Sequence, residues 1–274
     1  MVDADAPIGM FDSGAGGLAV LSEVLRLLPG EDVVYFADTA YFPYGPRRAD
    51  EIRARADAIT RDLVERGVKL IVVACNTATS GAIAHLRAKF DVPFLGMEPA
   101  LKPAAERTVS GNVALLVTPG TARGEKLAAL IDRYGAEVTV RTIEAPGLAE
   151  RVEAGDTDSE ATRELVRRYV APVRDSSADV LVLGCTHYAF LREAIEREAG
   201  DAIAVIEPSE AMARQVKRML SDRRLRNART EGGEVLYLCS GDERAFAALR
   251  AALEARSGKR DAGSASSQPK RNLV

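Results

Sequence analysis

The sequence lacks the features that mark several classes of protein. Its only cysteines, Cys75, Cys185 and Cys239, are too few and too scattered for a disulfide framework, and no CxxC or HxxxH pair offers a metal cluster. The longest unbroken apolar runs, such as residues 70–75, are as long as one buried strand and far shorter than the roughly 20 residues that cross a bilayer. The sequence therefore predicts free thiols, no metal site and no membrane span.

The sequence also lacks a marked excess of either positive or negative charge. Lysine and arginine number 37 against 40 aspartate and glutamate, a net charge of −3, and no basic block precedes the C-terminal tail. This balance indicates no nucleic-acid or membrane-surface partner. Residues 1–7 carry acids where a signal peptide needs a basic start and an apolar run, so we expect a cytoplasmic protein. The apolar fraction of 47% is typical of a globular chain, and 274 residues suit two modest domains or one large one.

Short β-rich runs alternate with amphipathic stretches, a pattern typical of βαβ units with parallel strands. The same rhythm restarts after Pro99, which predicts a second α/β unit. A helix is expected after Pro208, then a strand and a last helix, and the pattern alone assigns this segment to neither unit. Strands are predicted at 8–11, 33–36, 70–75, 93–96, 112–118, 137–142, 179–185, 202–207 and 234–240, and helices at 17–28, 49–66, 78–89, 208–225 and 244–253.

Two segments separated by 110 residues echo each other. A buried strand runs into Cys75-Asn76-Thr77, and another runs into Cys185-Thr186-His187. Ligands of open parallel sheets bind beyond the carboxyl ends of the strands, so two facing units would place one cysteine on each wall of a cleft. Helix N-termini lower thiol pKa values and a neighbouring imidazole assists, although each cysteine alone could equally be a small buried hydrophobe, as we expect for Cys239.

Three loops offer further candidate groups. The glycine-rich turn at 12–17 follows a predicted strand and precedes a predicted helix, so its backbone N–H groups suit a carboxylate or phosphate ligand. The alternative interpretation is that Asp12 or Ser13 simply caps the helix. The loop at 37–50 holds Tyr44-Gly45 between two prolines. This stiff turn either directs backbone amides toward a ligand or belongs to a surface loop that is packed by its own tyrosine side chains. The turn at 118–121 adds hydroxyls or simply caps a helix.

The combined motifs carry more information than any one of them. In their order and spacing they resemble the glutamate racemases of the aspartate/glutamate racemase superfamily, over nearly the whole chain to about residue 255. The resemblance implies two similar α/β parallel-sheet domains with the active site in the cleft between them, and no cofactor. It also implies a first domain of 1–97 plus 209–256 and a second of 98–208, with 257–274 as a disordered tail. The motifs are DSGAGG at 12–17, PYG at 43–45, ACNTA at 74–78, GMEPA at 96–100, TPGT at 118–121 and GCTHY at 184–188.

The resemblance also implies roles for individual residues. Cys75 and Cys185 match the two acid/base thiols, and Asp12, His187 and Glu153 match the groups that assist them. Glu153 lies in a VExG motif whose surroundings depart from the family's usual cysteine-containing stretch. The matching substrate-binding positions are Asp12, Ser13, Tyr44, Gly45, Asn76, Thr77, Thr118, Thr121, Thr186 and His187.

The implied activity is interconversion of L-glutamate and D-glutamate, supplying D-glutamate for peptidoglycan in the cell wall. Inverting an amino-acid centre without an electron sink requires removing a proton on one face and returning one on the other, which two facing thiols accomplish. The partner is then small-molecule glutamate, and the resemblance allows a homodimer. Alternatives are an aspartate racemase or related two-cysteine isomerase, a non-catalytic two-lobed binding protein, and a redox-sensing cysteine pair, which needs both sulfurs at disulfide distance.

Overall fold

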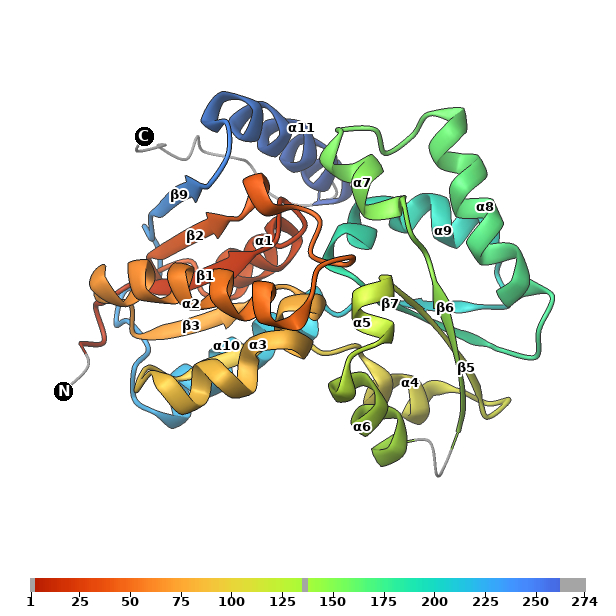
Figure 1. Ribbon diagram of the computed structural model, residues 1–274, viewed down its shortest axis with the longest axis horizontal. Helices are drawn as coiled ribbons and strands as arrows, with labels where there is room; N and C mark the ends of the chain where they lie inside the picture. The colour runs from red at the N-terminus through yellow and green to blue at the C-terminus, as the bar shows by residue number, and fades with distance from the viewer. Residues whose placement is uncertain (1–2, 135–137, 262–274) are drawn as a thin grey trace.

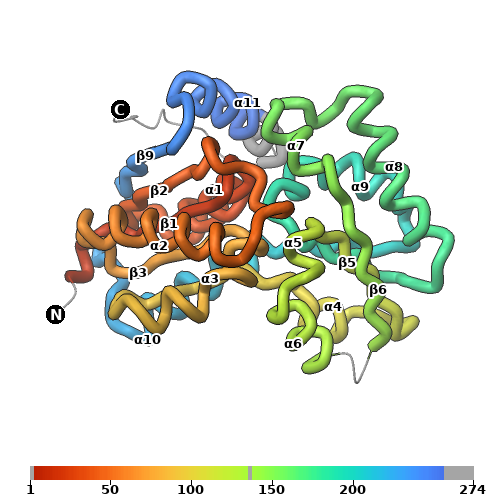
Figure 2. The backbone as a smooth tube through the Cα atoms, viewed as in Figure 1, coloured from red at the N-terminus to blue at the C-terminus, as the bar shows by residue number. Residues whose placement is uncertain are grey.

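Two α/β halves lie side by side in the computed structural model, which describes residues 3–134 and 138–261 (Figure 1 and Figure 2). One half is built around a five-stranded sheet and the other around a four-stranded sheet. Neighbouring strands are parallel throughout both sheets. The prediction of two α/β units with parallel sheets is confirmed.

The first sheet has the strand order β4-β3-β1-β2-β9. Its strands are β1 (Ile8–Asp12), β2 (Val33–Ala37), β3 (Leu70–Val73), β4 (Phe94–Gly96) and β9 (Val235–Cys239). The helices of this half are α1 (Leu18–Leu27), η1 (Thr39–Tyr41), α2 (Ala49–Glu65), α3 (Asn76–Lys89), α10 (Ser209–Asp222) and α11 (Glu243–Asp261).

Alternate residues of these strands face two different layers of helices. In β3, Leu70 and Val72 pack in one apolar cluster with residues of α1 and α10. Ile71 and Val73 pack in another cluster with α2 and α3. Because side chains alternate along a strand, a strand covered on both faces is apolar at every position, which explains the continuous apolar runs in the sequence.

The second sheet has the order β6-β5-β7-β8 and is layered in the same way. Ala114 and Leu116 of its central β5 pack with α8, whereas Leu115 and Val117 pack with α4 and α6. Its strands are β5 (Asn112–Val117), β6 (Thr139–Glu144), β7 (Val180–Gly184) and β8 (Ala204–Ile206). Its helices are α4 (Leu101–Arg107), α5 (Pro119–Ala122), α6 (Glu125–Tyr134), α7 (Leu148–Glu153), α8 (Glu160–Arg174), η2 (Thr186–Leu191) and α9 (Arg192–Ala199).

The segment after Pro208 lies with the first sheet. Its strand β9 pairs with β2, and its helix α10 packs against α1. Helix α11 reaches over the junction of the two halves toward α7 (Figure 1). The residue boundaries of the two domains stay a prediction.

The predicted start of the C-terminal tail at Ser257 is too early. Helix α11 continues to Asp261, because extending a formed helix by one turn adds a hydrogen bond for each residue fixed and needs no new nucleus. The remainder of the predicted tail, 262–274, lies outside the described residues.

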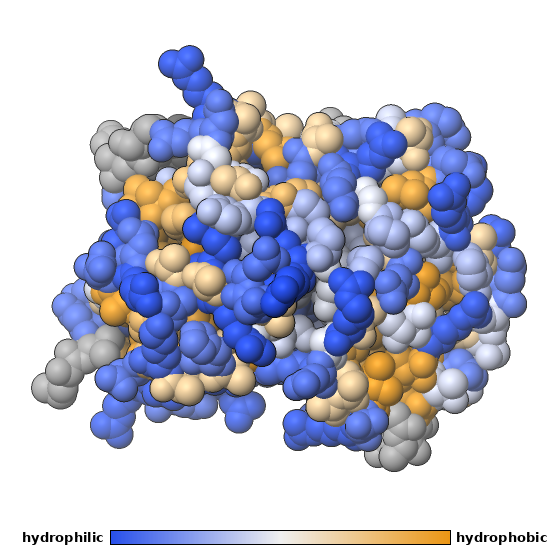
Figure 3. Space-filling view, viewed as in Figure 1, coloured by the Kyte–Doolittle hydropathy of each residue, from blue (hydrophilic) through white to orange (hydrophobic). Residues whose placement is uncertain are grey.

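The described residues include no helix that is long and apolar enough to cross a membrane. In the view of Figure 1, hydrophilic side chains cover most of the surface where the two halves meet (Figure 3).

Candidate active site

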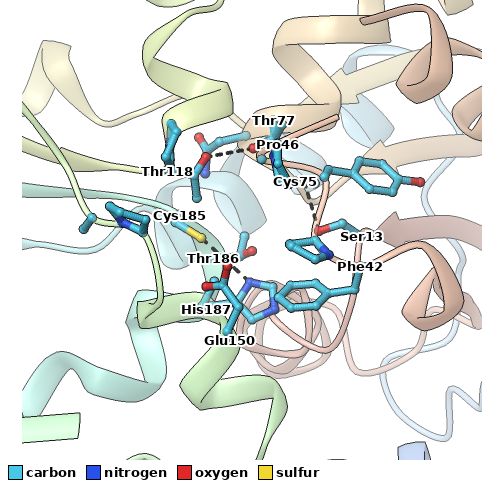
Figure 4. Close-up of a pocket in the computed structure, with 18 of the residues that line it drawn as sticks. Ser13, Phe42, Pro46, Cys75, Thr77, Thr118, Glu150, Cys185, Thr186 and His187 are labelled. Carbon is cyan, nitrogen blue, oxygen red and sulfur yellow. Dashed lines mark hydrogen bonds between the residues drawn. The ribbon is translucent and has the colours of Figure 1, made fainter. Parts of the chain in front are cut away.

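A cavity of about 380 Å³ lies between the two halves. Its walls come from the segments that follow the carboxyl ends of strands in both sheets, the place where open α/β sheets bind ligands. Both predicted thiols reach it, one from each half (Figure 4). The lining residues are Ser13, Phe42, Pro43, Tyr44, Gly45, Pro46, Cys75, Asn76, Thr77, Thr118, Pro119, Arg123, Ala145, Pro146, Ala149, Glu150, Cys185, Thr186 and His187.

Cys75 follows β3 with only Ala74 between them, and it caps the N-terminus of α3. Its side chain is 5% exposed, and its Sγ accepts a hydrogen bond from the backbone N–H of Ala78 at 3.4 Å. The thiol lies 3.6 Å from the hydroxyl oxygen of Ser13, to which it donates. Burial raises the pKa of the Cys75 thiol well above its usual range, and the nearby charge of Asp12 raises it further. Cys75 therefore tends to hold its proton.

Cys185 occupies the equivalent position after β7 but has a different partner. Its Sγ lies 3.7 Å from Nδ1 of His187, and Nε2 of that ring lies 2.7 Å from Oε1 of Glu153. Burial lowers the pKa of His187, but its contacts with Cys185 and Glu153 outweigh burial and hold the pKa well above the usual value. Since Nε2 donates to the carboxylate and the raised pKa keeps the ring protonated, Nδ1 also carries a proton and directs it at the sulfur.

The glycine-rich turn between β1 and α1 directs its N–H groups at carboxylates of the protein. Asp12 accepts hydrogen bonds from the N–H groups of Ser13 at 2.7 Å and Gly17 at 2.6 Å. The N–H of Ala15 donates to Oε1 of Glu153, which belongs to the other half. These three N–H groups bind carboxylates of the protein and are not free for a ligand. The sequence left a ligand site and a plain helix cap open for this turn and gave no sign that Glu153 is a partner.

Two glycines of this turn are needed because the second half approaches it closely. A Cβ atom on Gly14 would lie 2.0 Å from Oε1 of Glu153, and one on Gly16 would lie 2.3 Å from Nδ1 of His187. No side chain fits at either position without moving the acid or the imidazole. The glycines therefore allow a close approach between halves.

Asp12, Glu153 and Thr121 are not among the residues that line the cavity, although the resemblance makes them site residues. Asp12 is fully buried behind the wall, where Thr186 Oγ1 donates to it at 3.2 Å. Burial raises the pKa of Asp12, and the positive charge of His187 partly offsets that effect. The hydroxyl of Thr121 lies 3.2 Å from that of Thr77 in the other half and accepts from that of Thr118 at 3.1 Å, and Thr77 and Thr118 are themselves 3.0 Å apart.

Asn76 is the wall residue with the clearest capacity to bind a ligand. It is buried, and neither its Nδ2 nor its Oδ1 has a hydrogen-bond partner among the described residues. A buried amide without partners is costly, so a ligand that supplies an acceptor and a donor would be stabilised there. The cavity also offers the hydroxyl groups of Ser13, Thr118 and Thr186.

The loop after β2 lines the cavity as expected, but Tyr44 presents no hydroxyl to it. The ring is buried and its hydroxyl donates to Asp38 at 2.5 Å, where burial raises the pKa of Tyr44. Arg55 of α2 donates to both carboxylate oxygens of Asp38, at 3.0 and 2.6 Å. Tyr44 therefore anchors the loop, and Gly45 is left to face the cavity.

Sequence reasoning missed several wall residues. Arg123 donates from its guanidinium to the carbonyl oxygen of Gly45 at 2.9 Å, which ties the second half to the loop of the first. Phe42 and Glu150 also line the cavity. Phe42 lies in a proline-rich loop, and Glu150 lies three residues before Glu153 on the same helix, α7. Both are weak sequence signals, because ordinary surface segments have the same composition. No group of three potential His, Cys, Asp or Glu metal ligands occurs within residues 3–134 and 138–261.

Known proteins match this chain along most of its length. The family model described as Asp/Glu/Hydantoin racemase matches residues 8–216. A glutamate racemase of Herpetosiphon aurantiacus is 50% identical over 250 residues, which cover 91% of this chain and 98% of that relative.

Two solved structures share the fold. Glutamate racemase isoform RacE1 of Bacillus anthracis superposes with a TM-score of 0.83 at 28% identity, covering 98% of both chains. Escherichia coli glutamate racemase, solved with L-glutamate and the activator UDP-MurNAc-ala, gives 0.81 at 31% identity, covering 92% of this chain and 95% of its own. The chain therefore belongs to the Asp/Glu/Hydantoin racemase family and, within it, to the glutamate racemases.

Proposed function

We propose that the protein interconverts L-glutamate and D-glutamate with two cysteine thiols and no cofactor, which makes it an amino-acid racemase, an isomerase. The observation that carries this proposal is that Cys75 and Cys185 line one cavity from opposite halves, with Ser13 and Asp12 beside Cys75 and His187 beside Cys185. A single base cannot serve both faces of an α-carbon quickly, whereas two facing thiols can.

The reaction from L-glutamate begins with Cys185 as thiolate and Cys75 as thiol. Cys185 takes the α-proton, so an S–H bond forms and the C–H electron pair stays on the substrate. Cys75 then delivers its proton to the opposite face, which completes D-glutamate and leaves Cys75 as thiolate. The reverse reaction restores the starting state. We assign His187 and Glu153 to support Cys185, and Asp12 to support Cys75, as positioning residues that act through the thiols.

Similarity to known proteins favours glutamate over other amino acids as the substrate. The 50% identical relative is a glutamate racemase, and the E. coli structure holds L-glutamate. The substrate's carboxylates and ammonium group would find hydrogen-bonding groups on five residues of the cavity wall, Ser13, Asn76, Thr77, Thr118 and Thr186. An aspartate racemase remains the second candidate, because one methylene changes specificity by only about 10- to 200-fold.

The direct test is the rate of racemisation by the purified protein with no cofactor added. Circular dichroism would follow L-glutamate and D-glutamate separately, with both aspartate enantiomers as the comparison. We expect turnover of both glutamate enantiomers and none in Cys75→Ala or Cys185→Ala. Faster turnover of aspartate would make the protein an aspartate racemase. Ligand binding without turnover would favour the two-lobed binding protein, and a Cys75–Cys185 disulfide in peptide mass spectra would favour the redox pair.

The cellular role follows from the product. D-glutamate made in the cytoplasm would enter peptidoglycan biosynthesis and thereby support cell shape. Expression in a bacterial strain that requires external D-glutamate should restore growth without it. The Cys185→Ala variant, expressed at the same level, should fail to do so. Growth with both versions would argue against this role.

A further inference from the structure

Tyr35 of β2 is a fully buried titratable residue that the two-thiol mechanism does not use. Its hydroxyl donates to the carbonyl oxygen of Gly14 at 3.2 Å. Its ring stacks on Phe246 of α11 with an interplanar angle of 6°, and it lies beside Tyr237 of β9. A buried tyrosine held on both sides of its ring places its hydroxyl in one position.

The Gly14 carbonyl and the Ala15 N–H belong to the same peptide group. That N–H donates to Oε1 of Glu153, and the same oxygen lies 2.7 Å from Nε2 of His187. The opposite ring nitrogen, Nδ1, lies 3.7 Å from Sγ of Cys185. An unbroken series of contacts therefore runs from Tyr35 in the first half to Cys185 in the second.

We propose that Tyr35 is a positioning residue for the Cys185 half of the reaction, acting through the Gly14–Ala15 peptide, Glu153 and His187. The inference rests on the proposed two-thiol function. The hydroxyl fixes the orientation of the peptide, and the peptide N–H fixes the carboxylate that holds the imidazole against the sulfur. Hydrogen bonds joined in series also polarise one another, so the donor at one end strengthens the contacts further along.

The surroundings of the Tyr35 hydroxyl keep it in place as a hydrogen-bond donor to the turn. A Cβ atom on Gly17 would lie 2.9 Å from the Tyr35 hydroxyl oxygen, so glycine is needed there for the hydroxyl to reach the turn. The titratable groups that act on Tyr35 are Asp12, Glu153, Tyr237 and Cys75, and burial among them raises its pKa well above the usual value. Tyr35 therefore stays protonated and remains a hydrogen-bond donor.

The test is Tyr35→Phe, which removes one hydroxyl and keeps the ring. We expect kcat to fall on the order of tenfold in both directions with KM little changed, because misplacing an acid–base group slows proton transfer more than binding. The sharper readout is the pKa of His187, followed by NMR in protein labelled at histidine. The chain has only two histidines, so His85, on α3 and bonded to Asp57, is an internal control.

The expected shift has a definite sign. The contact with Glu153 raises the pKa of His187, so loosening that carboxylate should lower the pKa by about one unit. Asp12 and Cys185, the other titratable groups near His187, are unchanged by the substitution. The NMR signals of the His85 ring should be the same in Tyr35→Phe as in the unchanged protein.

Tyr237→Phe is the matched control. Tyr237 faces Tyr35 in the register of β2 and β9, but its hydroxyl donates to Glu254 at 3.2 Å instead of the glycine turn. It should leave kcat and the His187 titration unchanged. An unshifted His187 in Tyr35→Phe, or an equal shift in Tyr237→Phe, would overturn the proposal.

A second variant tests the route of the coupling. Glu153→Gln should lower the pKa of His187 by itself, and adding Tyr35→Phe should then change little, because both substitutions interrupt one series of contacts. Additive shifts would show that Tyr35 acts by another path. The NMR measurement needs no substrate, so it stays informative even if the protein fails to racemise glutamate.

Discussion

Cys75 and Cys185 occupy equivalent positions after their strands but differ in their neighbours. Cys75 has a hydroxyl and a buried carboxylate nearby, whereas Cys185 has an imidazole backed by a carboxylate. The reaction needs one thiol ionised while the other holds a proton. Different neighbours on the two sides provide that asymmetry before the substrate arrives.

The protonation of Cys75 gives a pH prediction. Because burial and the charge of Asp12 raise its pKa, Cys75 should keep its proton to higher pH than an ordinary thiol. Alkylation of Cys75 by iodoacetamide, measured by peptide mass spectrometry from pH 6 upward, should reach half its maximal rate above about pH 9. Asp12→Asn should move that midpoint to lower pH because it removes the negative charge. A midpoint below pH 8 in the unchanged protein would contradict this interpretation of the site.

The assignment of each thiol to one face of the substrate gives a second prediction. Elimination of a leaving group from a β-substituted glutamate needs proton abstraction on only one face. The resemblance to glutamate racemases assigns Cys75 to the D enantiomer and Cys185 to the L enantiomer. Cys75→Ala should therefore eliminate only from the L enantiomer, and Cys185→Ala only from the D enantiomer, while neither racemises. Ketoacid release from both enantiomers would be measured for both variants, and the same preference in both would refute the facing-thiol arrangement.

The β1–α1 turn illustrates how one short element serves both halves. Its N–H groups hold Asp12 of its own half and Glu153 of the other. Its glycines let the His187 ring approach the backbone. A turn with side chains could cap α1 equally well but could not accept this neighbour.

Gly16→Ala tests whether glycine is needed in this turn for the close approach of His187. The new Cβ would lie 2.3 Å from Nδ1 of His187, so the ring must leave its position against Cys185. We expect a loss of kcat on the order of 100-fold, as a misplacement of about 1 Å can cause. Gly81→Ala is the control, since that Cβ, inside α3, would meet Ile52 at 3.3 Å, away from both thiols. Near-normal activity in Gly16→Ala would show that the turn can hold a side chain at position 16 without displacing His187, and would contradict this interpretation.

At the scale of the whole molecule, a buried ion pair joins distant segments of the first half. Lys69 is 0% exposed and Glu31 2%, and they form an ion pair just before β3 and β2. Lys69 also donates to the carbonyl oxygen of Ala4, and Glu31 accepts from the N–H of Asn227 at 2.8 Å. These contacts lie at the amino ends of the strands, opposite the cavity.

Removing one partner of this pair should destabilise the fold without changing the chemistry. Lys69→Met leaves the Glu31 carboxylate buried without its partner, which should lower the free energy of unfolding by about 3–5 kcal/mol. Adding Glu31→Gln removes the remaining charge and keeps an acceptor for Asn227, so it should recover much of the loss. Urea unfolding would measure both, and kcat of the folded protein should stay unchanged. A double variant no more stable than the single one would show that the charge is not the cause.

Local patterns in the sequence determined the strands, the five α-helices of the first half and the two cysteine segments, but placed none of the helices of the second half. Apolar runs such as residues 70–73 become buried strands because a short continuous apolar run and the turn residues that bound it are signals carried by only a few neighbouring positions. The echo after Cys75 and Cys185 placed both thiols at strand ends, where the structure has them. The resemblance to glutamate racemases added the assisting residues, and their roles stay predictions.

Only the tertiary structure decided which groups meet. The Ala15 N–H finds Glu153 across 138 positions of the chain, and Lys69 finds Glu31 across 38. The turn's amides suited a ligand as well as a carboxylate of the protein, and nothing local distinguishes these partners. Such contacts depend on which surfaces of the two halves face each other once both sheets are formed. That is a property of packing, because each contact is stabilised only when the burial of many other residues has already brought the segments together.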